Sequence, residues 1–107
     1  MRRLPLLMAV AALLAGPAAA PAQVRQEADT AFRPAVPSPA YPAGQGPRVL
    51  FDEAHLNFHT ASGRYKPFVD LVTADGYRVT PNAAPFSAAT LAGHDVLVIA
   101  NAAGARG

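Results

Sequence analysis

Short apolar runs alternate with amphipathic stretches from residue 48 onward, and this alternation predicts the order strand-helix-strand-helix-strand. Apolar runs this short are typical of buried strands, whereas apolar residues spaced three and four apart are typical of one helix face. The expected strands are Val49–Phe51, then Tyr77–Thr80 with Pro81 and Asn82 ending it, and finally Asp95–Ala100.

Two helices are predicted between these strands. Pro67 fits the first turn of the longer one, where a backbone N–H has no partner to lose, and Gly76 fits the position just after its end. The shorter helix is expected to contain Leu91, with Ser87 as its N-cap and Gly93 closing it. The apolar face of the longer helix comprises Tyr65, Phe68, Val69, Leu71 and Val72.

The alternating order predicts an α/β fold with a parallel sheet, because right-handed crossovers place each helix over a sheet face. We expect a three-layer arrangement with the flavodoxin-like strand order 2-1-3. The strand Asp95–Ala100 has an unbroken apolar core, which is typical of a strand buried on both faces. Nothing after this strand is expected to cover it, so residues 48–107 are interpreted as the N-terminal part of a domain that is incomplete at the C-terminus.

The N-terminal residues 1–22 have the pattern of a secretory signal peptide. Arg2 and Arg3 precede the apolar run Leu4–Ala15, and Ala20-Pro-Ala22 forms a cleavage site before Gln23. The apolar run is about a dozen residues, shorter than the roughly 20 of a membrane helix. We therefore expect no stable membrane span after cleavage and a periplasmic or secreted protein; the alternative is an uncleaved anchor helix.

A Pro/Ala-rich stretch, residues 23–47, follows the signal and shows neither helical nor strand periodicity. Such composition predicts a disordered linker between the signal and the folded part. The other interpretation is a proline-rich ligand for a partner protein.

Charge and cysteine content exclude several function classes. The chain has 9 Lys and Arg against 7 Asp and Glu, but Arg2 and Arg3 leave with the signal, so 7 of each sign remain. The basic excess therefore belongs to the targeting segment, and we expect no nucleic-acid partner. The absence of cysteine excludes disulfides, thiol nucleophiles and cysteine-ligated metals within these residues.

Polar side chains gather directly after the first strand, where ligand sites of open α/β sheets lie. With strand order 2-1-3, the end of the third strand should face them across a crevice. Asp52 and Glu53 are adjacent, so only one carboxylate should face the crevice, which disfavours a paired-carboxylate mechanism. The candidate ligand-binding residues are Asp52, Glu53, His55, Asn57, His59 and Asn101.

Three interpretations of this loop stay open. Its polar groups either hydrogen-bond the loop backbone and cap the following helix, or contact a ligand or substrate, or bind a metal through His55 and His59. The metal is the least favoured, because Asn57 and the residues that follow indicate a loop rather than a helix. No metal and no cofactor are therefore predicted.

Several segments together resemble the start of a family of exported bacterial proteins of unknown function that carry a class I glutamine amidotransferase-like domain. The resemblance spans residues 48–103 and implies the fold. Enzymes of that fold use a cysteine on a later turn, and no cysteine is present here. The segments that carry the resemblance are 49–60, Gly63-Arg-Tyr-Lys-Pro-Phe68, Asp75-Gly-Tyr77 and 95–101.

Two functions are compatible with these features. The first is a periplasmic binding or scaffold module, whose partner is an unknown small molecule or a periplasmic protein. The second is a hydrolase or amidotransferase-like enzyme whose nucleophile lies beyond Gly107.

Overall fold

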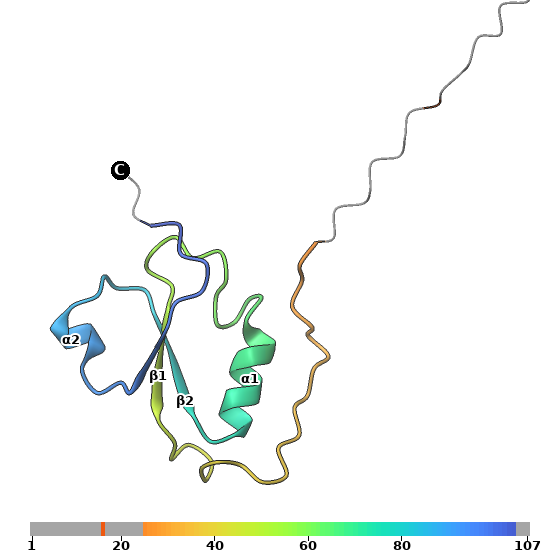
Figure 1. Cartoon of the computed structure of the whole chain (residues 1–107), viewed down its shortest axis with the longest axis vertical. Helices are drawn as coiled ribbons and strands as arrows, with labels where there is room; N and C mark the ends of the chain where they lie inside the picture. Colours follow the sequence, from red (N-terminus) through yellow and green to blue (C-terminus); the bar gives the residue numbers. More distant parts are fainter. Residues whose placement is uncertain (1–15, 17–24, 105–107) are drawn as a thin grey trace, which may run out of the picture.

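The computed structural model describes residue 16 and residues 25–104 of the chain (Figure 1). The predicted signal peptide, residues 1–22, and its cleavage site lie outside the described residues, apart from Gly16.

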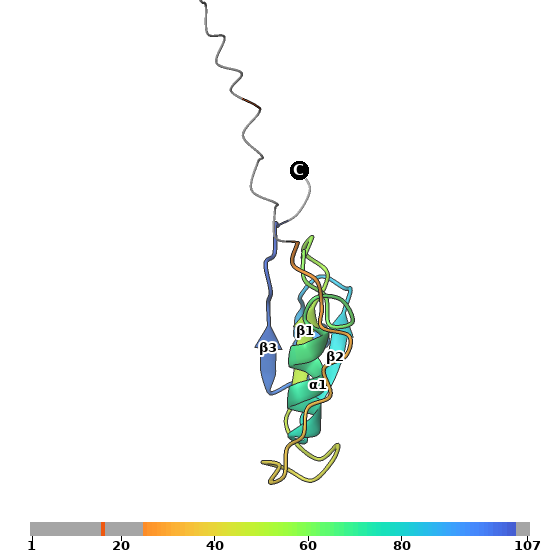
Figure 2. The same ribbon diagram turned by 90° about the vertical axis from the view of Figure 1, so that its right-hand side faces the viewer.

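The folded part contains three strands and two helices in the predicted alternating order. They are β1 (Arg48–Asp52), α1 (Lys66–Ala74), β2 (Arg78–Asn82), α2 (Ala88–Leu91) and β3 (Val96–Val98). The strands form a parallel sheet in the order β2-β1-β3, which confirms the predicted topology. The two helices lie on opposite sides of this sheet (Figure 1), and Figure 2 shows β1 and β2 behind α1, with β3 to their left.

Strand β1 is central and carries most of the core. Val49 is in register with Val79 of β2 and Val96 of β3. Phe51 is fully buried and packs with Ala61 and Ala100. Burying one large apolar side chain of this kind stabilises a fold by about 1.5–3 kcal/mol. The core therefore lies at the carboxyl half of β1, directly beneath the candidate loop.

The ends of both helices are formed by the residues that the sequence indicated. Pro67 lies in the first turn of α1, and Gly76 follows it with φ of 102°. Ser87 caps α2 by accepting from the Thr90 amide at 3.1 Å, and Thr90 in turn accepts from the Ser87 amide at 2.8 Å. A cap of this kind contributes about 1 kcal/mol, so it fixes where this four-residue helix begins.

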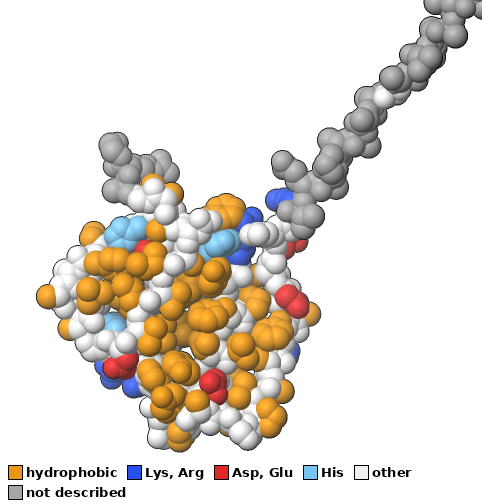
Figure 3. Space-filling model, in the orientation of Figure 1, with side chains coloured by type: hydrophobic (Ala, Val, Ile, Leu, Met, Phe, Trp, Pro, Cys, Tyr) orange, Lys and Arg blue, Asp and Glu red, His pale blue; other side chains and the backbone are white. Residues whose placement is uncertain are grey.

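Two expectations about the strands are wrong. Strand β2 includes Pro81 and Asn82 rather than ending before them, and proline is tolerated because β2 is an edge strand of the described sheet. Strand β3 is not buried on both faces: Val96 and Leu97 are 42% and 41% exposed, and Ile99, directly after the strand, is 51% exposed. Strand β3 is an edge strand of the described sheet, and Figure 3 shows many apolar side chains on the face of the molecule that it draws.

The residues just before β1 are part of the folded unit. Residues 25–47 contain no helix or strand, but Tyr41 packs edge-on against Tyr77 at 5.5 Å and its amide donates to the Asp75 carbonyl at 3.1 Å. The Gly46 amide donates to the Gly76 carbonyl at 2.8 Å. The expectation of a disordered linker up to residue 47 is therefore wrong for its last eight or so residues, because they bond the turn between α1 and β2.

Among the residues that the structure describes, no helix is both long enough and apolar enough to cross a bilayer.

Candidate functional site

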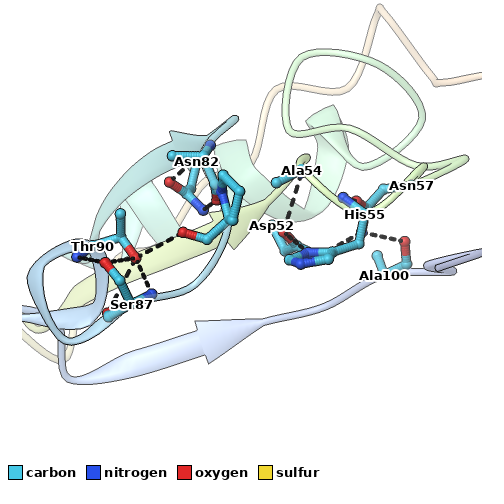
Figure 4. Close-up of polar contacts among 10 residues, drawn as sticks. Asp52, Ala54, His55, Asn57, Asn82, Ser87, Thr90 and Ala100 are labelled. Carbon is cyan, nitrogen blue, oxygen red and sulfur yellow. Dashed lines mark hydrogen bonds and ion pairs between the residues drawn. The ribbon is translucent and has the colours of Figure 1, made fainter. Parts of the chain in front are cut away.

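The candidate site is built around the carboxylate of Asp52, the last residue of β1. Its side chain is fully buried, yet both oxygens accept hydrogen bonds from the loop that follows (Figure 4). Oδ1 accepts from the Ala54 amide at 3.1 Å, and Oδ2 accepts from Asn57 Nδ2 at 3.0 Å. The ring Nδ1 of His55 lies 2.8 and 2.9 Å from the two oxygens. A buried carboxylate needs such partners, because it has lost its water shell.

These bonds keep Asp52 ionised. Burial by itself raises the pKa of Asp52, but the hydrogen bonds from His55, Asn57 and the Ala54 amide, together with the attraction of His55, outweigh it. The pKa of Asp52 is therefore held below its ordinary value of 3.8. At neutral pH the centre of the loop is a fixed negative charge surrounded by donors.

Asn57 connects this centre to the chain that follows β3. Its Oδ1 accepts from the His55 amide at 2.9 Å, and its Nδ2 also lies 3.4 Å from the Ala100 carbonyl. Its backbone forms an isolated antiparallel bridge with Ala102. The side chain of Asn57 thus holds the loop in shape while its backbone attaches the loop to residues 100–104.

The predicted proximity of Asn101 to this loop is confirmed. The Phe58 amide donates to the backbone carbonyl of Asn101 at 3.2 Å, so the contact runs through the backbone rather than the side-chain amide. Asn101 has φ of 49°, a left-handed conformation that asparagine adopts more readily than most residues. The Gly104 amide donates to the His55 carbonyl at 3.1 Å and completes the attachment.

The His55 side chain reaches solvent. Its side chain is 31% exposed, whereas that of Asp52 is fully buried. One face of its ring packs against Phe86, from the segment between β2 and α2, with ring centroids 4.5 Å apart. The ring is therefore fixed on one side by a carboxylate and on another by an aromatic ring.

Glu53 and His59 lie outside the Asp52 cluster. The Glu53 amide donates to the Asn82 carbonyl at 2.8 Å, which continues the β1–β2 pairing by one residue. The His59 ring packs against Tyr65 at 5.0 Å and against Phe58 at 5.2 Å. Of the six candidates, the structure joins Asp52, His55 and Asn57 through side chains, and Asn101 through its backbone.

The interpretation that the loop's polar groups cap the following helix is wrong. Helix α1 follows Tyr65 and has no side-chain cap. The other part of that interpretation agrees with the structure, because the side chains of Asp52 and Asn57 accept hydrogen bonds from backbone amides of the loop itself. Among the described residues, no group of three or more His, Cys, Asp and Glu side chains is placed to hold a metal ion.

Two features of the site were missed at the level of sequence. Phe86 gave no signal, because its contact with His55 depends on how the segment after β2 folds back. The sequence does contain a signal for the side-chain cluster around Asp52. An aspartate at a strand end, followed by polar residues within one turn, commonly accepts backbone amides two residues on. Asp52 makes this bond to Ala54 and then adds His55 and Asn57.

Two open grooves lie beside α1, away from this cluster. The larger, of about 390 Å³, separates residues 32–34 from α1, and the smaller, of about 240 Å³, lies between α1 and β2. Both include Lys66 and Asp70, which form an ion pair one helical turn apart. None of the six candidate residues lines either groove, so the Asp52 cluster rather than a groove is the better candidate for specific chemistry.

Comparison of the chain with known proteins finds no matching family model, no matching curated protein and no matching solved structure.

The lowered pKa of Asp52 predicts a loss of stability in acid. A group whose folded pKa lies below its unfolded value stabilises the fold above that unfolded value, and this contribution disappears as the pH falls through the folded pKa. We expect the free energy of unfolding, measured by urea titration, to fall as the pH is lowered from 3.8. In the Asp52→Asn variant this part of the fall should be missing, and stability near pH 6 should be lower by about 1–3 kcal/mol.

The exposed Asp29, whose carboxylate accepts only from the nearby Ala31 amide among the described residues, provides a matched control. Asp29→Asn should keep the acid dependence of the original chain. Identical acid profiles for the original chain and Asp52→Asn would contradict the role assigned to the Asp52 carboxylate.

Proposed function

We propose that the chain forms an exported α/β domain that acts as a binding or scaffold module in the periplasm or outside the cell. Its occupant is a small molecule or a periplasmic protein, held at the loop after β1. The proposal of export derives from the pattern of residues 1–22. The resemblance to exported proteins with a glutamine amidotransferase-like domain agrees with the proposal of export and implies no particular activity.

The observation that carries the binding role is the preorganised His55. A side chain that is fixed by a buried carboxylate and an aromatic neighbour, yet is 31% exposed, loses little conformational entropy when it contacts a ligand. It also lies at the carboxyl end of the central strand, beside the segment that follows β3. That edge is where open α/β sheets bind their ligands.

A second candidate is a hydrolase or amidotransferase-like enzyme whose nucleophile follows Gly107. The pair of Asp52 and His55 favours it, because a carboxylate that orients an imidazole through Nδ1 is the arrangement that activates hydroxyl or thiol nucleophiles. The feature that separates the two candidates is a Ser or Cys on a strand-turn-helix turn beyond residue 107. We place the binding module first because no nucleophile partner lies in the Asp52 cluster among the described residues.

Export is tested by the N-terminus of the mature protein. Expressed with its own leader in a Gram-negative host, the protein should be recovered from the periplasmic or medium fraction with Gln23 as its first residue. Peptide sequencing by mass spectrometry reads this directly. Recovery of cytosolic protein that retains Met1 would refute the proposed export.

Binding is tested with a panel of small polar compounds: neutral sugars, amino acids, dicarboxylates and inorganic phosphate. Saturation-transfer NMR on the full chain should detect at least one bound compound, and His55→Gln should weaken its affinity by about tenfold, the effect of one good hydrogen bond.

The matched control for this experiment is His94→Gln, which makes the same change just before β3, at the opposite edge of the sheet. Its affinity should equal that of the original chain. If no compound binds the original chain, a small-molecule occupant is wrong. If a compound binds His55→Gln as tightly as the original chain, the binding role of His55 is wrong.

A further inference from the structure

The hydrogen bonds around Asp52 determine which nitrogen of the His55 ring carries the proton. An ionised carboxylate only accepts hydrogen bonds. Its other partners, the Ala54 amide and Asn57 Nδ2, are donors as well. Nδ1 of His55 lies within 2.9 Å of both carboxylate oxygens and must therefore be protonated to bond them. In the neutral ring, the free lone pair is then on Nε2.

The lone pair on Nε2 is available to a molecule outside the loop. Within the described part of the chain, both hydrogen bonds of the ring are made at Nδ1. The side chain is partly exposed, and Phe86 packs against the ring at 4.5 Å. Figure 4 shows Asp52, His55 and Asn57 close together, joined by hydrogen bonds. The exposed part of the ring is thus a hydrogen-bond acceptor of fixed orientation next to an apolar surface.

We propose that His55 presents Nε2 as a proton acceptor and that the site takes a neutral ligand with a hydroxyl group, such as a sugar or another polyol. The ligand class rests on the binding role proposed above; the state of the ring does not. A hydroxyl donates to the lone pair, while the carbon skeleton of a polyol can contact Phe86. Anions fit poorly, because a lone pair repels them and the Asp52 carboxylate lies directly behind the ring.

The state of the ring can be measured without any ligand. Long-range ¹H–¹⁵N NMR on the ¹⁵N-labelled full chain, at alkaline pH where imidazole rings are neutral, distinguishes protonated from unprotonated ring nitrogens. His55→Gln assigns the signals. We expect His55 to carry its proton on Nδ1, the reverse of the preference of unconstrained histidine. A proton on Nε2, or a mixture of the two forms like that of free histidine, would overturn the proposal.

Two variants distinguish the effect of the Asp52 carboxylate on the His55 ring from the effect of the rest of the loop. Asp52→Asn replaces the acceptor-only group with an amide that can also donate. The ratio of the Nδ1-protonated to the Nε2-protonated form of the neutral ring should therefore fall about tenfold. Asn57→Ala removes a neighbour of the carboxylate but leaves the Asp52–His55 bond, and should keep the proton on Nδ1. If Asp52→Asn does not fold, the spectrum of the original chain decides by itself.

The ligand class is tested with D-glucose, glycerol and inorganic phosphate as probes, each titrated into the same labelled protein. A neutral probe should shift the Nε2 resonance of His55, and phosphate should not. Binding of phosphate at His55, with no neutral probe bound, would overturn the ligand class. If none of these probes and no compound of the wider panel binds, the proposed small-molecule occupant and its ligand class fail. The measured state of the ring is decided separately.

Discussion

The buried carboxylate of Asp52 is the constraint on which the carboxyl edge of this sheet depends. A charge without solvent is tolerated only when donors surround it, and here the donors come from the next five residues of the chain. The loop therefore has little freedom to adopt another shape. A single residue at the end of the central strand converts the end of a core element into an ordered polar site.

The same constraint extends to the chain after β3. Asn57 bonds Asp52 and also lies near the Ala100 carbonyl, and its backbone is bridged to Ala102. Phe51, directly before Asp52, packs against Ala100 in the core. The packing of Phe51 against Ala100 and the hydrogen bonds of Asn57 thus join β1 and its loop to the segment after β3. Strand β3 itself is short, and Val96 and Leu97 in it are exposed.

The fold was predictable because its elements have strong local signals. Pro67 and Gly76 bracket α1, Ser87 starts α2, and alternating strands and helices with right-handed crossovers leave few topologies. The boundaries of β2 and the burial of β3 were not predictable, because both depend on whether a strand is at the edge of the sheet. An apolar composition such as that of residues 96–100 shows that a strand can be buried, not that something buries it.

The site was predictable in position but not in detail. The polar residues after β1 and the proximity of residue 101 follow from strand order alone. Which candidates act together does not, because His55 and Asn57 reach Asp52 only through the turn that the backbone makes at residues 53–56, where Leu56 has φ of 52°. His59 has the same chemical character as His55 but packs against aromatic rings instead. Side-chain type identified the candidates, and loop geometry selected among them.

Hydrogen exchange of individual backbone amides tests the central role of Asp52 most directly. In the original chain, the amides of Phe58 and Gly104, which bond across the loop and the segment after β3, should be protected. In Asp52→Ala, both amides should exchange at least tenfold faster than in the original chain. The exchange rates of the amides in the β1–β2 ladder should change less. Equal protection of Phe58 and Gly104 in the two proteins would contradict the account, since the loop would then keep its shape without the carboxylate.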